Sequence, residues 1–245
     1  MAISLLQSGR GSSVSATGTV PFTMGTATYT LPQATQAGSL LIIHHAGTAH
    51  SHTAGQFEGP SAAISIPGLG SFSSPAGNQW KEGTNTTGGI ADIDYLANAA
   101  SVPMGTVVSV TFSMPGSGVT YDVTGEFYFY EFAGVVTSNP VEVAHSFNSP
   151  NTGVPTQNNL TTVNTDLIMV GYAGSDSNAA AGSGYTIGSS MLVSVYSEVQ
   201  YILNQSPGTF TTSFGSGSQT HFGGFAVAFK AAAATANSSY GFFFG

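Results

Sequence analysis

The amino-acid sequence predicts an all-β fold, a large antiparallel β-sandwich that is jelly-roll-like. Three observations predict it. Only 6% of the 245 residues are charged, and the 32 glycines are roughly twice the average share. Short segments that alternate polar and apolar residues are rich in β-branched and aromatic side chains, and clusters of Gly, Pro, Ser and Asn separate them. No segment has the apolar period of a long helix.

Eleven segments carry this strand pattern. In chain order they cover residues 2–7, 26–31, 39–45, 91–96, 106–113, 121–132, 141–147, 166–172, 192–203, 208–214 and 222–230. Residues 40–43 and 167–170 are continuously apolar, which predicts central strands that are covered on both faces. The two-residue repeat of a strand places Phe127 and Phe129 on one inward face.

The chain has no segment that reads as a linker between two domains, and no exact internal repeat. We therefore predict one domain over residues 1–230, with residues 50–89 as its longest irregular segment. Residues 231–245 form an Ala/Ser spacer and a tail that carries Phe242, Phe243 and Phe244. Three adjacent phenylalanines in water favour aggregation, so we expect the tail to dock on a neighbouring subunit or a larger scaffold. The alternative is that it folds onto its own sandwich or is disordered.

Charge and composition exclude several classes of function. The formal net charge is −8 and only three residues are Lys or Arg, so the chain has no basic surface for nucleic acid or anionic membranes. It has no cysteine, which excludes thiol chemistry, and no apolar run that could cross a bilayer. The first residues lack the cationic region of a signal peptide. Because lysine usually protects exposed sheet edges, its scarcity favours assembly with other subunits.

The histidines suggest one candidate metal site. His44, His45, His50 and His52 lie within nine residues of one another. His50 and His52 are two residues apart and would share one strand face, with Glu58 as a further ligand of a divalent metal ion. The alternative is that these histidines are surface or interface residues, because adjacent His44 and His45 point to opposite faces and no metal-binding spacing is matched.

Two aspartates form a second candidate site. Asp92 and Asp94 share a strand face, and with Glu82 or Asp176 they could form a carboxylate pair for glycoside hydrolysis or a calcium cluster. The simpler interpretation is that both aspartates lie on the solvent-exposed face of a strand and have no site to form. The chain has no nucleophile elbow and no glycine-rich phosphate loop, so we predict that it is not an enzyme and needs no cofactor.

Trp80 is the only tryptophan. An exposed tryptophan beside tyrosines can stack on sugar rings, whereas a buried one seals the end of a sandwich. The sequence leaves both roles open.

Several short segments resemble a β-sandwich module of tailed-bacteriophage structural proteins and of some bacterial surface proteins. They are Met1-Ala-Ile-Ser-Leu-Leu-Gln-Ser8, Ala37-Gly-Ser-Leu-Leu-Ile-Ile43, Gly77-Asn-Gln-Trp80, Tyr130-Glu-Phe-Ala-Gly134, Asp166-Leu-Ile-Met-Val170 and Phe225-Ala-Val-Ala-Phe-Lys230. The histidine cluster and the phenylalanine tail depart from this pattern. The resemblance implies a jelly-roll-like virion component and supplies no catalytic residues.

This resemblance sets the functional expectation. We expect a non-enzymatic virion protein, either a capsid decoration protein or a projecting fibre component, that is made in the host cytoplasm. It would form a homo-oligomer, with a trimer favoured, and contact other virion proteins such as the major capsid protein, with Phe242 to Phe244 as interface anchors. The alternative is a carbohydrate-binding adhesin or lectin-like module in which Trp80 stacks on a host surface glycan.

Overall fold

A computed structural model describes residues 1–53, 59–81, 87–149, 153–174, 179–192 and 196–233; within these ranges, nothing is described of the side chains of residues 78–81, 149, 158, 191 and 192. The described residues form strands, turns and loops without a helix, so the predicted all-β class is confirmed. No helix of this part of the chain could therefore cross a membrane. The strands are β1 (Ser4–Arg10), β2 (Val14–Thr19), β3 (Phe22–Thr30), β4 (Ser39–Ser51), β5 (Ser61–Ser65), β6 (Ser73–Lys81), β7 (Thr87–Ala99), β8 (Val107–Met114), β9 (Thr120–Ala133), β10 (Val141–Ser149), β11 (Thr156–Thr162), β12 (Asp166–Gly174), β13 (Thr186–Leu192), β14 (Tyr196–Gln205), β15 (Gly208–Ser213) and β16 (Phe222–Lys230).

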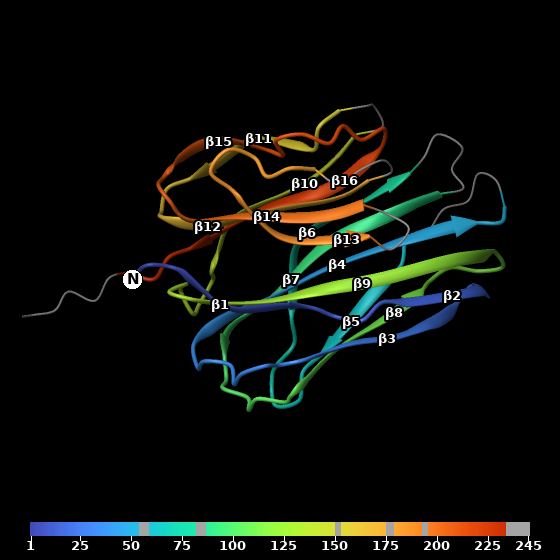
Figure 1. The fold of residues 1–245 in the computed structure, drawn as a ribbon, viewed down its shortest axis with the longest axis horizontal. Helices are drawn as coiled ribbons and strands as arrows, with labels where there is room; N and C mark the ends of the chain where they lie inside the picture. The colour runs from blue at the N-terminus through green and yellow to red at the C-terminus, as the bar shows by residue number, and fades with distance from the viewer. Residues whose placement is uncertain (54–58, 82–86, 150–152, 175–178, 193–195, 234–245) are drawn as a thin grey trace, which may run out of the picture.

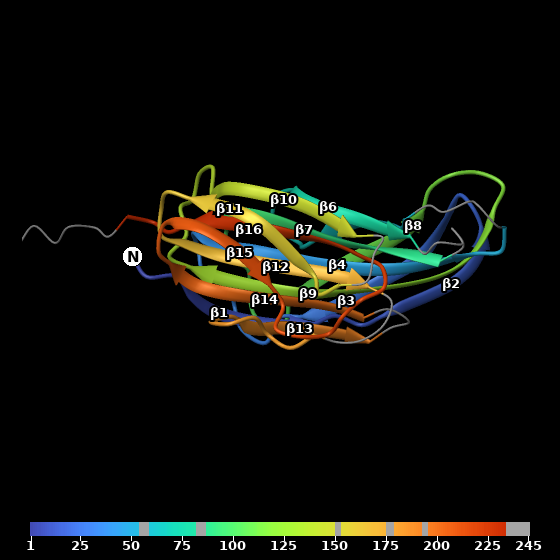
Figure 2. The same ribbon diagram turned by 90° about the horizontal axis from the view of Figure 1, so that it is seen from above.

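The strands form four antiparallel sheets that stack face to face (Figures 1 and 2). The first outer sheet has the order β3-β8-β5, and the first inner sheet has the order β1-β9-β4-β7-β6, with β2 also beside β9. The second inner sheet is β10-β16-β12-β14-β13, and the second outer sheet is β11-β15. The packing is that of a β-sandwich, but the molecule has four layers where a single sandwich has two.

Both inner sheets are buried on both faces, as the continuous apolar runs predict. Leu41 and Ile43 of β4 pack toward the first outer sheet, and Leu40 and Ile42 pack toward the second inner sheet. All nine residues of β12 are buried. Strand β9 follows the same rule, because Phe127 and Phe129 belong to one core cluster and Tyr130 and Phe132 to the next. Alternate residues of one strand therefore belong to two different hydrophobic cores, one on each side of the sheet, and neither side is exposed to solvent there.

The two halves of the chain repeat one strand arrangement. The N-terminal half (residues 1–133) builds the first inner and outer sheets, and the C-terminal half (residues 141–230) builds the second pair. Strands β1, β9, β4, β7 and β6 of one inner sheet occupy the same order as β10, β16, β12, β14 and β13 of the other. Only β2 and β5 have no counterpart. The chain therefore contains two copies of one architecture, although it has no exact sequence repeat.

The register confirms this correspondence at the level of single residues. Leu40 pairs with Phe132 in the first inner sheet, and Leu167 pairs with Phe229 in the second. A register shift follows Ser39 in β4 and Asp166 at the matching place in β12. Opposite these shifts, Asn98 and Asn204 both have a positive φ, of 54° and 56°. Asparagine tolerates this left-handed conformation better than most residues.

One pair of aromatic contacts between the two halves is reciprocal. Tyr95 of the first half contacts Phe229 of the second, with ring centroids 5.6 Å apart and an interplanar angle of 69°. The equivalent residues, Tyr201 and Phe132, make the reciprocal contact at 6.0 Å and 73°. The reciprocity is local, because β6 packs closely on β10 and β16 whereas the equivalent strand β13 does not pack as closely on β1 and β9.

The sequence missed five strands. These are β2, β5, β6, β11 and β13, and each lies at the edge of its sheet. The prediction that residues 50–89 are irregular is therefore wrong, because β5 and β6 lie there. These five strands are rich in Ser, Thr, Gly, Ala and Asn, and their few large apolar residues do not alternate regularly with polar ones, so they lack the pattern that identifies a strand.

The described ends of the chain lie together. The Met1 amino group donates a hydrogen bond to the Ala232 carbonyl oxygen at 2.6 Å. In Figure 1 this end of the molecule is opposite the end at which β4 finishes. Residues 234–245, with Phe242, Phe243 and Phe244, lie outside the described residues, so the expected docking of the tail remains a prediction.

Candidate functional site

His44 is a structural residue between the two inner sheets. Its Nδ1 atom lies 3.0 Å from the Asp92 carbonyl oxygen, and its Nε2 atom lies 3.0 Å from the Ser197 hydroxyl. The ring also packs on Phe225. Burial lowers the pKa of the His44 imidazole to about 3, so the ring is neutral in the folded protein. His45 points to the other face, as the alternation predicts, and its ring contacts Phe112.

The predicted metal ligands His50 and His52 have separate partners. His50 Nδ1 lies 2.9 Å from the Thr87 hydroxyl, whereas His52 Nε2 lies 2.9 Å from Asp122 Oδ2, and the two ring centroids are 6.2 Å apart. Among the residues that the structure describes, no three His, Asp or Glu side chains are placed to hold a metal. Glu58 lies outside those residues. The three-ligand set therefore remains a prediction.

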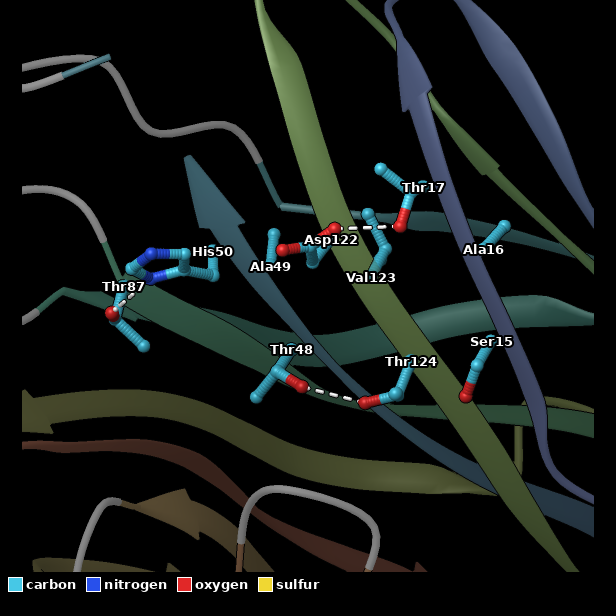
Figure 3. A pocket seen from close by; sticks show the side chains of 10 residues that line it. All are labelled: Ser15, Ala16, Thr17, Thr48, Ala49, His50, Thr87, Asp122, Val123 and Thr124. Carbon is cyan, nitrogen blue, oxygen red and sulfur yellow. Dashed lines mark hydrogen bonds between the residues drawn. The ribbon is translucent and has the colours of Figure 1, made fainter. Parts of the chain in front are cut away.

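A hollow whose lining combines apolar side chains with several hydroxyl groups lies beside His50, at the end of the first inner sheet that is far from Met1 (Figure 3). We call its polar lining the hydroxyl face, which consists of Ser15, Thr17, Thr48, His50, Thr87, Asp122 and Thr124. The hollow has a volume of about 440 Å³. Thr48 and Thr124 are hydrogen-bonded at 2.6 Å, and the Thr17 hydroxyl donates to Asp122 at 2.6 Å. The hydrogen bond from Thr17, together with His52, lowers the pKa of Asp122.

The hydroxyl face is open because the strands differ in length. Strands β4 and β9 have 13 and 14 residues, whereas β12 and β16 of the covering sheet have nine each. Thr48 continues the row of Leu40, Ile42 and His44 on β4, beyond the point that the second inner sheet covers. Along this row of β4, the residue type changes from apolar to hydroxyl near the end of the second inner sheet.

Trp80 stands in the same cross-strand row as two of these threonines. Thr124 is paired with Thr48, Thr48 with Gly89, and Gly89 with Trp80. The Trp80 side chain lies outside the described part of the molecule, so both predicted roles of this residue stay open.

A second hollow, which we call the acidic pocket, lies at the edge of the N-terminal half between its inner and outer sheets. His45, Asp92 and Asp94 line it, together with Pro60, Ser61 and Ser74 among others, and its volume is about 470 Å³. His45 Nε2 lies 2.9 Å from Asp94 Oδ2. Burial raises the pKa of Asp92, although the neighbouring His45 opposes this rise. The predicted shared face of Asp92 and Asp94 is therefore confirmed.

Two further acids belong to this candidate site. Glu82 and Asp176 lie outside the described residues. Asp92 and Asp94 are the only carboxylates among the described residues that line the pocket. The sequence did not indicate that His45 joins them, because β4 and β7 bring these residues together from 47 and 49 positions apart.

Two further buried carboxylates hold the N-terminal segment in place. Glu131 accepts hydrogen bonds from the Gln7 side chain and from the Gln36 backbone N–H, both at 2.6 Å. Glu126 pairs with Arg10, and burial raises the pKa of this carboxyl. These two acids have structural partners and are not part of either hollow.

Comparison with family models, with curated protein sequences and with solved structures finds no match.

Proposed function

We propose that the chain is a non-enzymatic structural protein of a tailed-bacteriophage particle, a capsid decoration or projecting fibre component that acts through contacts with other subunits and with the shell. The main support is the chemistry of the sheet edges. The edge strands are β1, β2, β3, β5, β6, β10, β11, β13 and β15. Their only charged residues are Arg10, Lys81 and Glu142.

Edges of this kind favour association. An edge strand presents backbone N–H and C=O groups that pair with another strand unless lysine, proline or a covering segment prevents it. Strand β5 has no charged residue, and its exposed positions alternate along the strand. Strand β13 carries Ile187, which is one of the few large hydrophobic side chains exposed on the described surface.

The arrangement of the molecule also suits a projecting component. Met1 and Ala232 lie at one end, and the hydroxyl face lies at the other. A protein that is attached through the end that carries Met1 would present the hydroxyl face outward.

This proposal requires self-association. The test is the mass of the chain in solution, measured for the wild type and for variants with a lysine on an edge strand. We expect light scattering of the full chain to show a homo-oligomer, with a trimer favoured. Ala63→Lys in β5 and Ile187→Lys in β13 place a charge on an edge, so the oligomer that uses that edge should dissociate. Val163→Lys is the matched control, because Val163 is 77% exposed and lies in the loop between β11 and β12. A monomeric wild-type chain would contradict self-association, and equal effects of all three variants on an oligomer would contradict association through β5 or β13.

The hydroxyl face supports a second candidate function, a carbohydrate-binding adhesin. Neutral hydroxyl side chains, one imidazole and one carboxylate offer the hydrogen bonds that sugars need, and Trp80 lies in the same cross-strand row. A panel of bacterial surface polysaccharides titrated against the full chain should change the fluorescence of Trp80, and Thr48→Val with Thr124→Val should weaken the response.

A matched control for this test lies on the first outer sheet. Thr26→Val with Thr111→Val removes a similar hydroxyl pair, which is bonded at 2.8 Å, and should leave the fluorescence response unchanged. A flat response across the panel would reject carbohydrate binding and leave the structural function in place.

A further inference from the structure

A third hollow lies at the end of the molecule that carries Met1 (Figure 1). We call it the terminal hollow, and its volume is about 240 Å³. Three parts of the chain meet there, namely residues 36–39 at the start of β4, residues 133–137 after β9, and the two described ends of the chain. Its apolar lining consists of Met1, Ala37, Ala133, Val135 and Ala232.

Small residues leave the terminal hollow open. Gly38 and Gly134 both line it, with φ angles of 82° and 81°, and this left-handed conformation favours glycine. Apart from its chain neighbours, a Cβ atom on Gly38 would have only the Thr137 Cγ2 atom within reach, at 4.0 Å. The two glycines, with the three alanines of the lining, leave a space that larger side chains would fill.

The chemistry of the terminal hollow suits an uncharged, apolar occupant. The Met1 amino group donates to the Ala232 carbonyl oxygen at 2.6 Å, and no charged side chain is among the described residues that line the hollow. The Met1 side chain is 61% exposed, which makes it one of the few large hydrophobic side chains on the described surface. Covering this apolar surface would release water and lower the free energy.

The chain carries such an occupant directly after the hollow. Ala232 belongs to the lining, and residues 233–241 lead from it to Phe242, Phe243 and Phe244. Residues 231–245 contain no charged side chain. Ten residues span up to about 33 Å when extended, and the entropic cost of closing a loop rises only slowly with its length. The connection is therefore long enough for a phenylalanine to return to the hollow.

The terminal hollow is also large enough for a phenyl ring. An apolar cavity of about 150 Å³ in a protein core binds benzene, and the terminal hollow measures about 240 Å³. A ring in this position would contact the methyl groups of the lining alanines. It would also lie beside the Met1 thioether, and sulfur–aromatic contacts are favourable.

We infer that the terminal hollow binds one of the phenylalanine rings of residues 242–244 of the same chain. A short tether gives the ring an effective concentration in the millimolar range, which favours the hollow of its own chain over that of a neighbour. The tail of a second copy is the other possible occupant, and the experiments distinguish the two. This inference does not depend on the proposed function.

Limited proteolysis of the full chain by chymotrypsin tests the docking, because this protease must hold an aromatic ring in its own hydrophobic pocket. Mass spectrometry measures the cleavage rate after each of the three phenylalanines. Ala37→Glu places a carboxylate in the terminal hollow, and a docked ring would desolvate it, so cleavage should become about tenfold faster. Ala34→Glu is the matched control, because Ala34 is exposed in the same loop and does not line the hollow.

Methyl nuclear magnetic resonance of the full chain supplies an independent measurement. A docked ring should shift the methyl signals of Ala133 and Val135 and show Overhauser contacts to them. Replacing all three phenylalanines by alanine should remove both effects and leave the methyl signal of Ala49, in the hollow at the other end, unchanged. In an equal mixture of labelled and unlabelled chains, isotope filtering separates contacts within one chain from contacts between chains.

Faster cleavage of Ala37→Glu but not of Ala34→Glu, together with methyl contacts within one chain, would support the inference. Four outcomes would overturn it. They are equal cleavage rates in the wild type and both variants, equal acceleration by both variants, methyl signals that do not respond to loss of the three rings, and ring contacts that occur only between chains. The last outcome would assign the terminal hollow to the tail of a second copy.

Discussion

The two halves of the chain share strand order and register, yet they treat one equivalent position in opposite ways. In the C-terminal half, Glu198 and Gln200 correspond by register to Asp92 and Asp94, and the backbone of residues 179–182 satisfies them. In the N-terminal half, Asp92 and Asp94 line an open pocket beside His45. The β architecture fixes where these side chains stand, and the connections between strands decide whether the space beside them is filled.

The outer sheets show why the connections differ. The first outer sheet contains the additional strand β5, whereas the second outer sheet has only β11 and β15. In the N-terminal half, the chain between β4 and β6 forms β5 and pairs with β8. The corresponding connection in the C-terminal half carries residues 179–182 over the inner sheet. An added edge strand therefore accompanies the open pocket.

The largest test of the correspondence is a pair of core substitutions. Phe132→Ala and Phe229→Ala remove equivalent, fully buried rings at the two reciprocal aromatic contacts, and each should lower the free energy of unfolding by about 3–5 kcal/mol. Chemical denaturation followed by circular dichroism measures both. If one substitution costs several times more than the other, the two contacts are not equivalent in energy.

Substitution of two glycines compares the filled position of the C-terminal half with the open acidic pocket of the N-terminal half. A Cβ atom on Gly182 would lie 2.0 Å from the Ser213 carbonyl oxygen, which is backbone, so Gly182→Ala should cost about 1–3 kcal/mol of unfolding free energy. A Cβ atom on Gly77 would meet the Asp92 carboxylate, which can move within the pocket, so Gly77→Ala should cost less. Thermal denaturation checks this order. The reverse order would mean that the Asp92 side chain is held as firmly as backbone.

The two acids offer a sharper comparison. Glu198→Ala leaves the Ala179 N–H and the Tyr172 hydroxyl without their acceptor, so it should cost about 1–3 kcal/mol. Burial raises the pKa of both carboxyls, but Asp92 lines an open pocket whereas Glu198 is enclosed by the chain, so the loss for Asp92→Ala should be smaller. Denaturant titrations at pH 7 compare the two variants. Equal losses would indicate that Asp92 has donors of similar strength in the folded protein.

The smallest expected effect is a difference in pH dependence between the halves. The folded-state pKa of His44 is lowered from 6.5 to about 3, so the unfolded chain binds the extra proton and this group makes stability rise with pH across that range. Burial, with the negative charge of Glu142, raises the pKa of Asp166 from 3.8 to about 7. The folded state then binds the extra proton, and this group makes stability fall as pH rises from about 4 to 7.

Single substitutions separate these opposing contributions. Asp166→Asn should make the slope of Tm against pH more positive between pH 4 and 7, and His44→Gln should make it more negative, each by a few degrees over the range. Calorimetry at several pH values measures both slopes. An unchanged slope in either variant would show that the substituted group does not titrate differently in the two states.

Much of the fold is predictable from the sequence, and the limits have a physical cause. Each of the eleven predicted strands overlaps a strand of the structure. The central strands carry strong apolar patterns, and the edge strands β1, β3, β10 and β15 keep enough apolar or aromatic residues to be recognised. The five missed strands are edges, whose stability comes from pairing with a neighbour rather than from their own apolar residues. The repeat of the two halves was missed because it lies in strand order and register, with few identical residues such as Tyr95 and Tyr201.

The candidate sites show the same limit. The opposite faces of His44 and His45 and the shared face of Asp92 and Asp94 follow from the strand repeat alone. The contact between His45 and Asp94 does not, because it depends on which strands become neighbours. The hydroxyl face likewise depends on the difference in length between β4 and the strands that cover the neighbouring part of its sheet.

The hydrogen bond between Met1 and Ala232 has a consequence for connectivity. With these two residues in contact and the halves joined by residues 134–140, the described chain is nearly a closed ring of two similar units. A circular permutant that links residue 232 to residue 1 and opens between β9 and β10 would be synthesised with the C-terminal half first. Its folded state would keep the same four sheets, so the order in which the two halves are translated is not dictated by their packing.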